Sequence, residues 1–292
     1  LITIDGKVMA VAFMANTQHL YVRTDVLKEN GIAIPKTYEE VVAAAEKIRA
    51  AGKMKYPYAA AYKAGWNLAE EFVNMYIGHG GEFFKAGTAE PNVNNAKGVA
   101  TLNMLKKLAD LSNPDYLTHD SEAIKVEWEA GNVAIMTLWA SRSGTLLDDE
   151  GDAKITAATK LVAPATVGGG NIPAATLWWD GFTLAKNRSD ADAEASFRAM
   201  AHAASSKEMV AKASDQAVWL VEGFVPGPKS VGVIEAVKMG AKPYPMLPQM
   251  GLMHGALGSE IVEFLQGNES AEQALKDVEA AYMTKAKEQG FL

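Results

Sequence analysis

The chain has 292 residues, of which 49% are hydrophobic and 22% are charged, so it can bury a sizeable core and is not expected to be disordered. That length favours two compact lobes or one large α/β unit. A net charge of -7 argues against nucleic acid or anionic membranes as partners. The lack of any cysteine excludes disulfides and thiolate metal sites.

The first half of the chain predicts a hairpin followed by alternating helices and strands. Asp5-Gly6 suits a hairpin turn, because both residues tolerate positive φ, and extended segments follow at 8–13 and 20–22. Thr37 and Glu40 form a capping box that begins a helix. Apolar spacing predicts further helices at 68–77, 96–111 and 122–130, and short strands at 133–138 and 160–164.

The second half begins with an extended aromatic segment and is mainly helical after it. This segment, Trp178-Trp179-Asp180-Gly181, is followed by predicted helices at 189–204, 255–265 and 271–286. Pro- and Gly-rich connections at 223–228 and 244–248 separate these helices. Because strands alternate with helices along the chain, the predicted fold class is α/β.

Motifs for catalysis, metals and phosphates are missing from the sequence. The five histidines stand far apart, and no Gly-x-Ser-x-Gly motif marks a serine nucleophile. The glycine run at 168–170 lacks the lysine and hydroxyl residue of a phosphate-binding loop. We therefore expect no catalytic residue, no metal and no cofactor, and we expect acidic pairs such as Glu70-Glu71 to lie on solvated faces.

Asp180 differs from the other carboxylates because it stands beside two tryptophans. Aromatic faces cover the C–H side of a sugar ring, and charged groups bond its hydroxyls, so this segment suits a carbohydrate site. The alternative is that Trp178 and Trp179 pack in the core and at an interface, with Asp180 capping a turn. Trp66 and Trp139 stand at element edges and leave the same two alternatives open, whereas Trp128 and Trp219 are assigned to packing.

The order of several short motifs resembles that of extracellular solute-binding proteins of the carbohydrate-importer type, the family of the maltose-binding protein. Asp5-Gly6-Lys7 precedes an apolar run, as in the family's crossover strand. Pro35 and the following Lys36-Thr37-Tyr38-Glu39-Glu40 are similar to the family's P-K-T-W-E-E. The motifs that carry the resemblance lie at 5–12, 16–27, 31–40, 131–137 and 248–250.

The resemblance implies a set of ligand-binding residues from four parts of the chain. Asn16 and Gln18 follow the crossover strand, and Trp66 lies in the next helix and loop. The strand after residue 134 ends at Trp139 and Arg142. The remaining contacts come from the hinge segment and from the region after Pro248. Among relatives, Trp-Trp-Asp-Gly is most similar to α-glucoside-binding members. The implied contacts are Asn16, Gln18, Trp66, Trp139, Arg142, Trp178, Trp179, Asp180 and His254.

The family's fold implies a type II periplasmic-binding architecture of two interleaved α/β lobes. Residues 1–14 and 181–241 are predicted in the first lobe, and residues 15–180 and 242–292 in the second. Because relatives begin with about a hundred further residues, we expect the first lobe to be incomplete in this chain. The hinge is expected at 12–16 and 180–183, where the chain passes between the lobes.

The implied function is capture of a sugar in the periplasm or outside the cell and its delivery to the membrane permease of an ABC importer. The protein is then a monomer and not an enzyme, and its ligand is an α-glucoside disaccharide such as maltose, sucrose or trehalose. Two alternatives stay open: a glycoside hydrolase that uses Asp180, and a binding protein of the same fold for a polyol or another polar solute.

Overall fold

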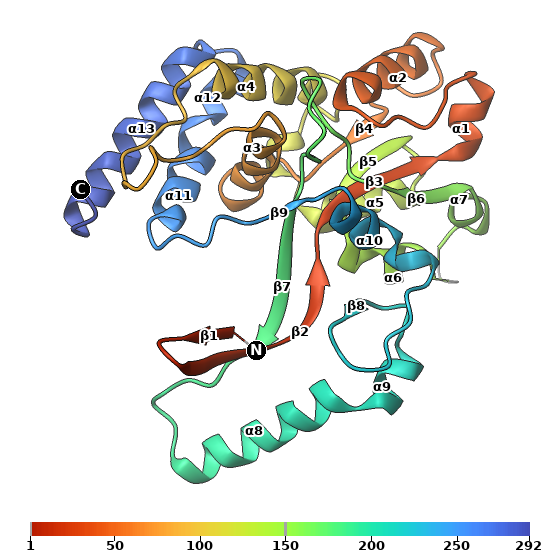
Figure 1. Cartoon of the computed structure of the whole chain (residues 1–292). Coiled ribbons are helices and arrows are strands. Elements are labelled where there is room, and N and C mark those ends of the chain that lie inside the picture. The colour runs from red at the N-terminus through yellow and green to blue at the C-terminus, as the bar shows by residue number, and fades with distance from the viewer. Residues whose placement is uncertain (1, 149–150) are drawn as a thin grey trace.

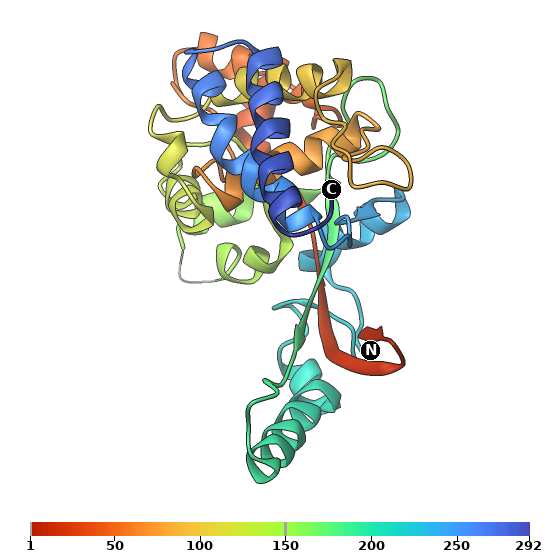
Figure 2. The ribbon, with the colours of Figure 1, turned by 90° about the vertical axis from the view of Figure 1, so that its left-hand side faces the viewer.

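Two long antiparallel strands, β2 (Lys7–Asn16) and β7 (Thr176–Phe182), run from a large lobe to a small lobe in the computed structural model (Figure 1). The structure describes residues 2–148 and 151–292. A quarter turn of the molecule leaves the two strands side by side between the same two bodies (Figure 2). In their register Asn16 faces Trp178, and Val11 faces Phe182. The strands therefore connect the lobes as a pair.

The large lobe is built on a four-stranded sheet whose central strand is buried on both faces. The strand order is β4 (Tyr58–Ala59), β5 (Ile135–Trp139), β3 (Gln18–Arg23) and β6 (Thr159–Val162). Successive side chains of a strand point to opposite faces. Leu20 and Val22 accordingly join one hydrophobic core, and Tyr21 joins a second core on the other face.

Helices cover both faces of this sheet, and side-chain caps begin several of them. On the face of Leu20 the core includes residues of α2, α3, α4, α11 and α13, and on the face of Tyr21 it includes residues of α5 and α6. Thr37 Oγ1 accepts from the N–H of Glu40, and Ser270 caps α13 in the same way. The helices of this lobe are α1 (Thr24–Glu29), α2 (Tyr38–Ala50), α3 (Trp66–Gly78), α4 (Ala96–Ala109), α5 (Ser121–Glu129), α6 (Ser143–Leu146), α7 (Ala153–Ala158), α10 (Val231–Lys238), α11 (Met250–Glu260), α12 (Val262–Gln266) and α13 (Ala271–Glu288). Short 3-10 turns lie at Tyr116–Thr118, Ala140–Arg142 and Pro228–Ser230.

The small lobe consists of β1 (Ile2–Ile4), the outer ends of β2 and β7, α8 (Asp190–Ser205), α9 (Lys207–Lys212) and β8 (Val218–Trp219). The turn between β1 and β2 has positive φ at Asp5 (49°) and Gly6 (75°), as the hairpin prediction requires. Phe13 packs between Phe182 and Trp219, with ring centroids 4.6 and 6.3 Å away. The short β9 (Lys242–Pro243) pairs with the other end of β7, in the large lobe.

The structure confirms the predicted α/β class and most of the predicted helices, and it also contains short helices that were not predicted, among them α1, α6 and α7. The helix predicted at 255–265 starts earlier, at Met250, and breaks at Ile261 into α11 and α12. Helix α10 was not predicted, and it packs on β3 and β6 of the large lobe although it falls within the 181–241 segment predicted in the other lobe. Its Gly232 rests on the ring of His19, an approach that a larger side chain would block. The remaining lobe boundaries stay a prediction.

None of the helices in the described part of the chain combines the length and apolar character that a membrane crossing requires.

Gly258 provides a stability test, because α11 touches the chain at the start of α3 there. The N–H of Gly65 donates to the Gly258 carbonyl over 3.0 Å, and a Cβ at residue 258 would lie 2.3 Å from the Gly65 carbonyl oxygen. We expect Gly258→Ala to lower the free energy of unfolding by about 1–3 kcal/mol, since backbone must shift. Gly255→Ala, on the same helix but facing open space, should raise it by up to about 1 kcal/mol. Urea unfolding measures both variants, and equal stabilities would contradict the predicted contact.

Candidate functional site

Five aromatic rings from five parts of the chain meet where β7 leaves the large lobe. Trp66 begins α3, Trp139 ends β5, Trp178 lies within β7, Tyr244 follows β9, and His254 lies in α11. We call these five residues the aromatic cluster. The ring centroid of Trp66 is 5.0 Å from that of His254, 5.8 Å from Trp178 and 6.2 Å from Trp139, and those of Trp178 and Tyr244 are 4.4 Å apart.

Hydrogen bonds inside the protein hold several members of the aromatic cluster in place. His254 Nε2 donates to the carbonyl oxygen of Trp66 over 3.0 Å, so Nδ1 is free to accept from the Tyr244 hydroxyl at 2.9 Å. This pairing assigns a neutral imidazole, and burial lowers the pKa of His254 in agreement with it. Trp178 Nε1 donates to Thr176 Oγ1 over 2.8 Å and lies 3.1 Å from Glu70 Oε1. The polar groups of three rings are thus used internally.

Trp66 is the most exposed ring of the cluster, and Trp139, Trp178 and Tyr244 are each partly exposed. Trp66 is 50% exposed, although it begins a helix that is buried from Leu68 onward. In the part of the chain that the structure describes, no partner is found for the indole N–H groups of Trp66 and Trp139. The cluster can therefore stack on an apolar face of a ligand and donate two hydrogen bonds at its edge.

Four of the residues predicted from the resemblance belong to this cluster: Trp66, Trp139, Trp178 and His254. Tyr244 was missed, because a residue between two prolines was assigned to a connection. An aromatic side chain whose backbone is held on both sides by proline is the signal that could have found it.

Asn16 and Gln18 flank the aromatic cluster on the paired strands, but their side chains bond to the protein. Asn16 faces Trp178 across β2 and β7, and its amide bonds Ser141 through Nδ2 and Oδ1. Gln18 faces Trp139 across β3 and β5 and is buried. As ligand contacts, Asn16 and Gln18 stay predictions.

Arg142, Trp179 and Asp180 lie outside the cluster. Arg142 forms an ion pair with Glu122 of α5. Trp179 is directed to the opposite face of β7 from Trp178, where it is 38% exposed. Asp180 is also exposed, and partial burial raises the pKa of its carboxyl. As ligand contacts these three residues stay predictions.

Glu70 and Glu71 were predicted on a solvated face, and that prediction is wrong, since both are buried in α3. Every residue of α3 from Leu68 to Gly78 is buried, so the helix has no solvated face. The two carboxyls instead belong to a buried polar network that also includes Gln18, Asn74 and Thr176. Gln18 Nε2 donates to Glu71 Oε1 over 2.9 Å, and Asn74 Nδ2 donates to Gln18 Oε1 over 3.1 Å. Burial raises the pKa of each carboxyl to about 8.

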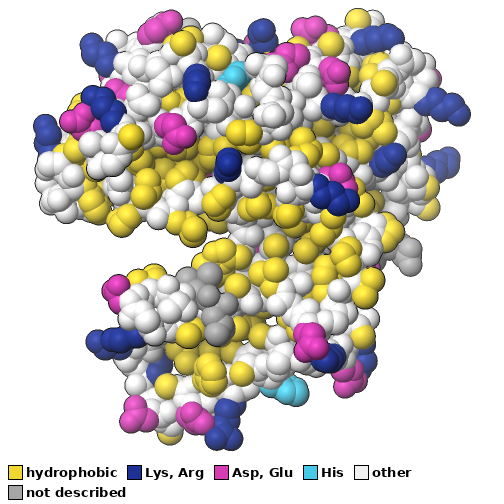
Figure 3. All heavy atoms as spheres, viewed as in Figure 1, with side chains coloured by type: hydrophobic (Ala, Val, Ile, Leu, Met, Phe, Trp, Pro, Cys, Tyr) yellow, Lys and Arg dark blue, Asp and Glu magenta, His cyan; other side chains and the backbone are white. Residues whose placement is uncertain are grey.

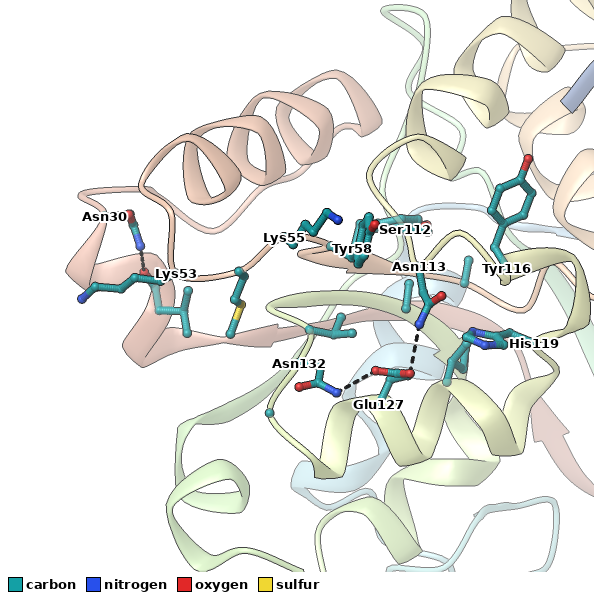
Figure 4. A pocket seen from close by; sticks show the side chains of 18 of the residues that line it. Asn30, Lys53, Lys55, Tyr58, Ser112, Asn113, Tyr116, His119, Glu127 and Asn132 are labelled. Atoms are coloured by element: carbon teal, nitrogen blue, oxygen red, sulfur yellow. Dashed lines mark hydrogen bonds between the residues drawn. The ribbon is translucent and has the colours of Figure 1, made fainter. Parts of the chain in front are cut away.

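The surface is hollowed between the two lobes, and hydrophobic side chains gather on both sides of the hollow (Figure 3). A separate pocket of about 390 Å³ lies on the large lobe between α1, β4 and α5 (Figure 4). Within this pocket the carboxylate of Glu127 accepts from Asn113 Nδ2 at 3.3 Å and from Asn132 Nδ2 at 2.8 Å. Over residues 2–148 and 151–292, no group of three His, Asp or Glu side chains is placed to hold a metal ion.

Sequence comparisons find similarity to bacterial solute-binding proteins. A family model described as "Bacterial extracellular solute-binding protein" matches residues 2–210. A "Probable ABC transporter-binding protein" from Deinococcus radiodurans is 32% identical over 193 residues, which is 63% of this chain. The match spans 44% of that relative's own length.

Solved structures share the fold. Maltose-bound MalE3 of T. maritima superposes with a TM-score of 0.83 at 20% identity, over 97% of this chain and 74% of its own. A solute-binding protein of Agrobacterium vitis S4 with bound D-mannitol gives a TM-score of 0.81 at 18% identity, over 99% and 75%. These likenesses show the type II periplasmic-binding fold that the resemblance implied.

The buried carboxyls predict how stability depends on pH. Between pH 4.5 and about 8 the unfolded chain releases protons that the native Glu70 and Glu71 retain, so the free energy of unfolding should fall as pH rises. Glu71→Gln should reduce the fall between pH 5.5 and pH 8 by about 1–3 kcal/mol. Urea unfolding at both pH values measures this, with Glu46→Gln on the exposed face of α2 as the control. If the free energy of unfolding falls with pH as steeply in Glu71→Gln as in the wild type, the Glu71 carboxyl of the native protein is ionised.

Proposed function

We propose that this chain, which belongs to the bacterial extracellular solute-binding protein family, captures a small carbohydrate at the aromatic cluster and delivers it to the membrane permease of an ABC importer. The bound molecule is held and released unchanged, and binding takes place in the periplasm or outside the cell. The family and the fold support the general role. The cluster supports the ligand class.

One observation carries the proposal: five rings from five parts of the chain converge beside the strands that join the lobes. Stacking on aromatic rings covers the C–H face of a sugar, and a pyranose is close in size to the half-exposed Trp66 indole. Because the polar atoms of His254, Tyr244 and Trp178 are engaged within the protein, the cluster presents mainly ring faces and the two indole N–H groups of Trp66 and Trp139. A flat ligand with polar groups around its rim suits that surface.

Closure of the lobes would complete the site, and the crossing strands contain a place where they can bend. The register of β2 against β7 shifts between Ala12 and Met14, opposite Gly181. Gly181 approaches β2 closely, since a Cβ there would lie 2.9 Å from the Val11 carbonyl oxygen. Both positions lie in the predicted hinge at 12–16 and 180–183. Rotation about this point brings the small lobe toward the aromatic cluster, and the closed form is the one that docks on the permease.

Within the carbohydrate class, an α-glucoside disaccharide such as maltose, sucrose or trehalose is the proposed ligand. The Trp-Trp-Asp-Gly motif supports it, and one structural relative is described with maltose bound. A polyol is the second candidate, because the D-mannitol-bound relative shares the same fold and the C–H groups of an alditol also pack on aromatic rings. The protein is proposed to act as a monomer.

Titration of the purified protein with maltose, sucrose, trehalose and D-mannitol tests the proposal through tryptophan fluorescence. Binding should change the emission, because the exposed Trp66 and the partly exposed Trp139 lose contact with water. Trp66→Ala should weaken binding of the ligand that responds by about 1–3 kcal/mol, as expected for loss of a stacking partner.

Trp128→Phe is the matched control, because Trp128 is buried in the large lobe with its ring against Tyr21 and is not a member of the aromatic cluster, so its replacement should leave the affinity within about twofold. Saturable binding that Trp66→Ala does not weaken would place the ligand elsewhere. Release of nitrophenol from a nitrophenyl α-glucoside would contradict the proposal and favour the hydrolase alternative.

A further inference from the structure

The indole of Trp178 is central to the aromatic cluster, and a hydrogen-bonded chain of buried groups holds it. Its ring lies within 6.0 Å, centroid to centroid, of Trp66, Trp139 and Tyr244. Its Nε1 donates to Thr176 Oγ1, and Glu70 Oε1 lies 2.8 Å from the same hydroxyl oxygen. Any turn of the Thr176 hydroxyl therefore alters the support of the ring.

The hydrogens of this chain can be counted. Asn74 Oδ1 accepts from the backbone N–H of Thr176 over 2.8 Å, which fixes the orientation of the amide. Thr176 Oγ1 lies 2.7 Å from that Oδ1 and 2.8 Å from Glu70 Oε1. A single hydroxyl hydrogen cannot serve two acceptors at these distances. If Thr176 donates to Asn74, the contact with Glu70 requires a hydrogen that the acid donates.

The surroundings of Glu70 also favour the neutral acid. Its Oε2 is buried, and no hydrogen-bond partner for it is found among the described residues. The ion pairs of the described residues include no Lys or Arg bonded to Glu70 or Glu71. The titratable groups that face Glu70 are Glu71, on the same helix, and the Tyr244 hydroxyl. Burial raises the pKa of Tyr244, and the nearby Glu70 raises it further. An ionised Glu70 would be an uncompensated buried charge.

We propose that Glu70 in its protonated form is a positioning residue: it donates to the Thr176 hydroxyl, which in turn holds the Trp178 indole in the aromatic cluster. The inference rests on the proposed function in so far as the cluster binds the ligand. Ionisation of Glu70 would force the Thr176 hydroxyl to turn away from Asn74. Because the indole N–H of Trp178 also lies 3.1 Å from Glu70 Oε1, loss of the proton would draw the ring toward the carboxylate, displace it within the aromatic cluster and weaken ligand binding above neutral pH.

Glu70→Gln and Glu70→Ala test this role, with maltose or whichever sugar of the panel responds as the probe. Glutamine donates a hydrogen at the same place without charge, so Glu70→Gln should bind within about twofold of the wild type, whereas Glu70→Ala should bind about tenfold more weakly. Wild-type affinity should fall between pH 6.5 and pH 9.5, and the affinity of Glu70→Gln should stay level. Glu46→Gln should keep the wild-type pH profile, because Glu46 lies on the exposed face of α2.

Equal affinities of Glu70→Ala and the wild type, or a wild-type pH profile in Glu70→Gln, would overturn the inference. If Glu70→Ala fails to fold by urea unfolding, the pH profile of Glu70→Gln decides alone. The near-UV circular dichroism of the unliganded protein provides a test that needs no sugar. The wild-type spectrum should change between pH 6.5 and pH 9.5, and that of Glu70→Gln should not. If no sugar binds the wild type, the proposed function fails, while this spectral comparison still supports or overturns the role of Glu70.

Discussion

The pairing of β2 with β7 is the constraint on which both the fold and the candidate site depend. It carries the chain between the lobes, and at its inner end it enters the buried polar network of the large lobe. Thr17 Oγ1 donates to the Thr176 carbonyl oxygen over 2.8 Å, so the two strands are tied where they leave the body. The same register sets Asn16 opposite Trp178. The hinge and the aromatic cluster are thus consecutive stretches of one ladder.

The candidate site combines an aromatic surface with buried polar groups behind it. Helix α3 presents Trp66 at its first residue, and Glu70, Glu71 and Asn74 of the same helix anchor the strands behind it. Because α3 contributes both the Trp66 ring and the buried side chains that bond Gln18 and Thr176, it holds the ring and the strands in a fixed relation. Exposed indoles beside a hinge would otherwise sample several rotamers, and ordering them on binding would cost affinity.

Sequence patterns predicted the elements that local chemistry determines. Caps such as Thr37 and Ser270 and the Asp5-Gly6 turn act within a few residues of themselves. The tryptophans of the cluster came from the family resemblance, because their meeting depends on how five distant segments pack. Burial of Glu70 and Glu71 could not be derived from their charge, since it depends on Gln18 and Thr176, more than fifty residues away on either side. Helix α10 was missed because it is short and lies between Pro- and Gly-rich segments, and its packing on β3 is a long-range contact.

A crystal structure of the protein with the sugar that responds in titration would show whether the aromatic cluster holds a carbohydrate. We expect a sugar ring packed within about 4 Å of the Trp66 and Trp178 indoles, with its hydroxyls toward the rim of the cluster. A sugar bound in the separate pocket beside Glu127, with the cluster rings uncontacted, would contradict the proposal.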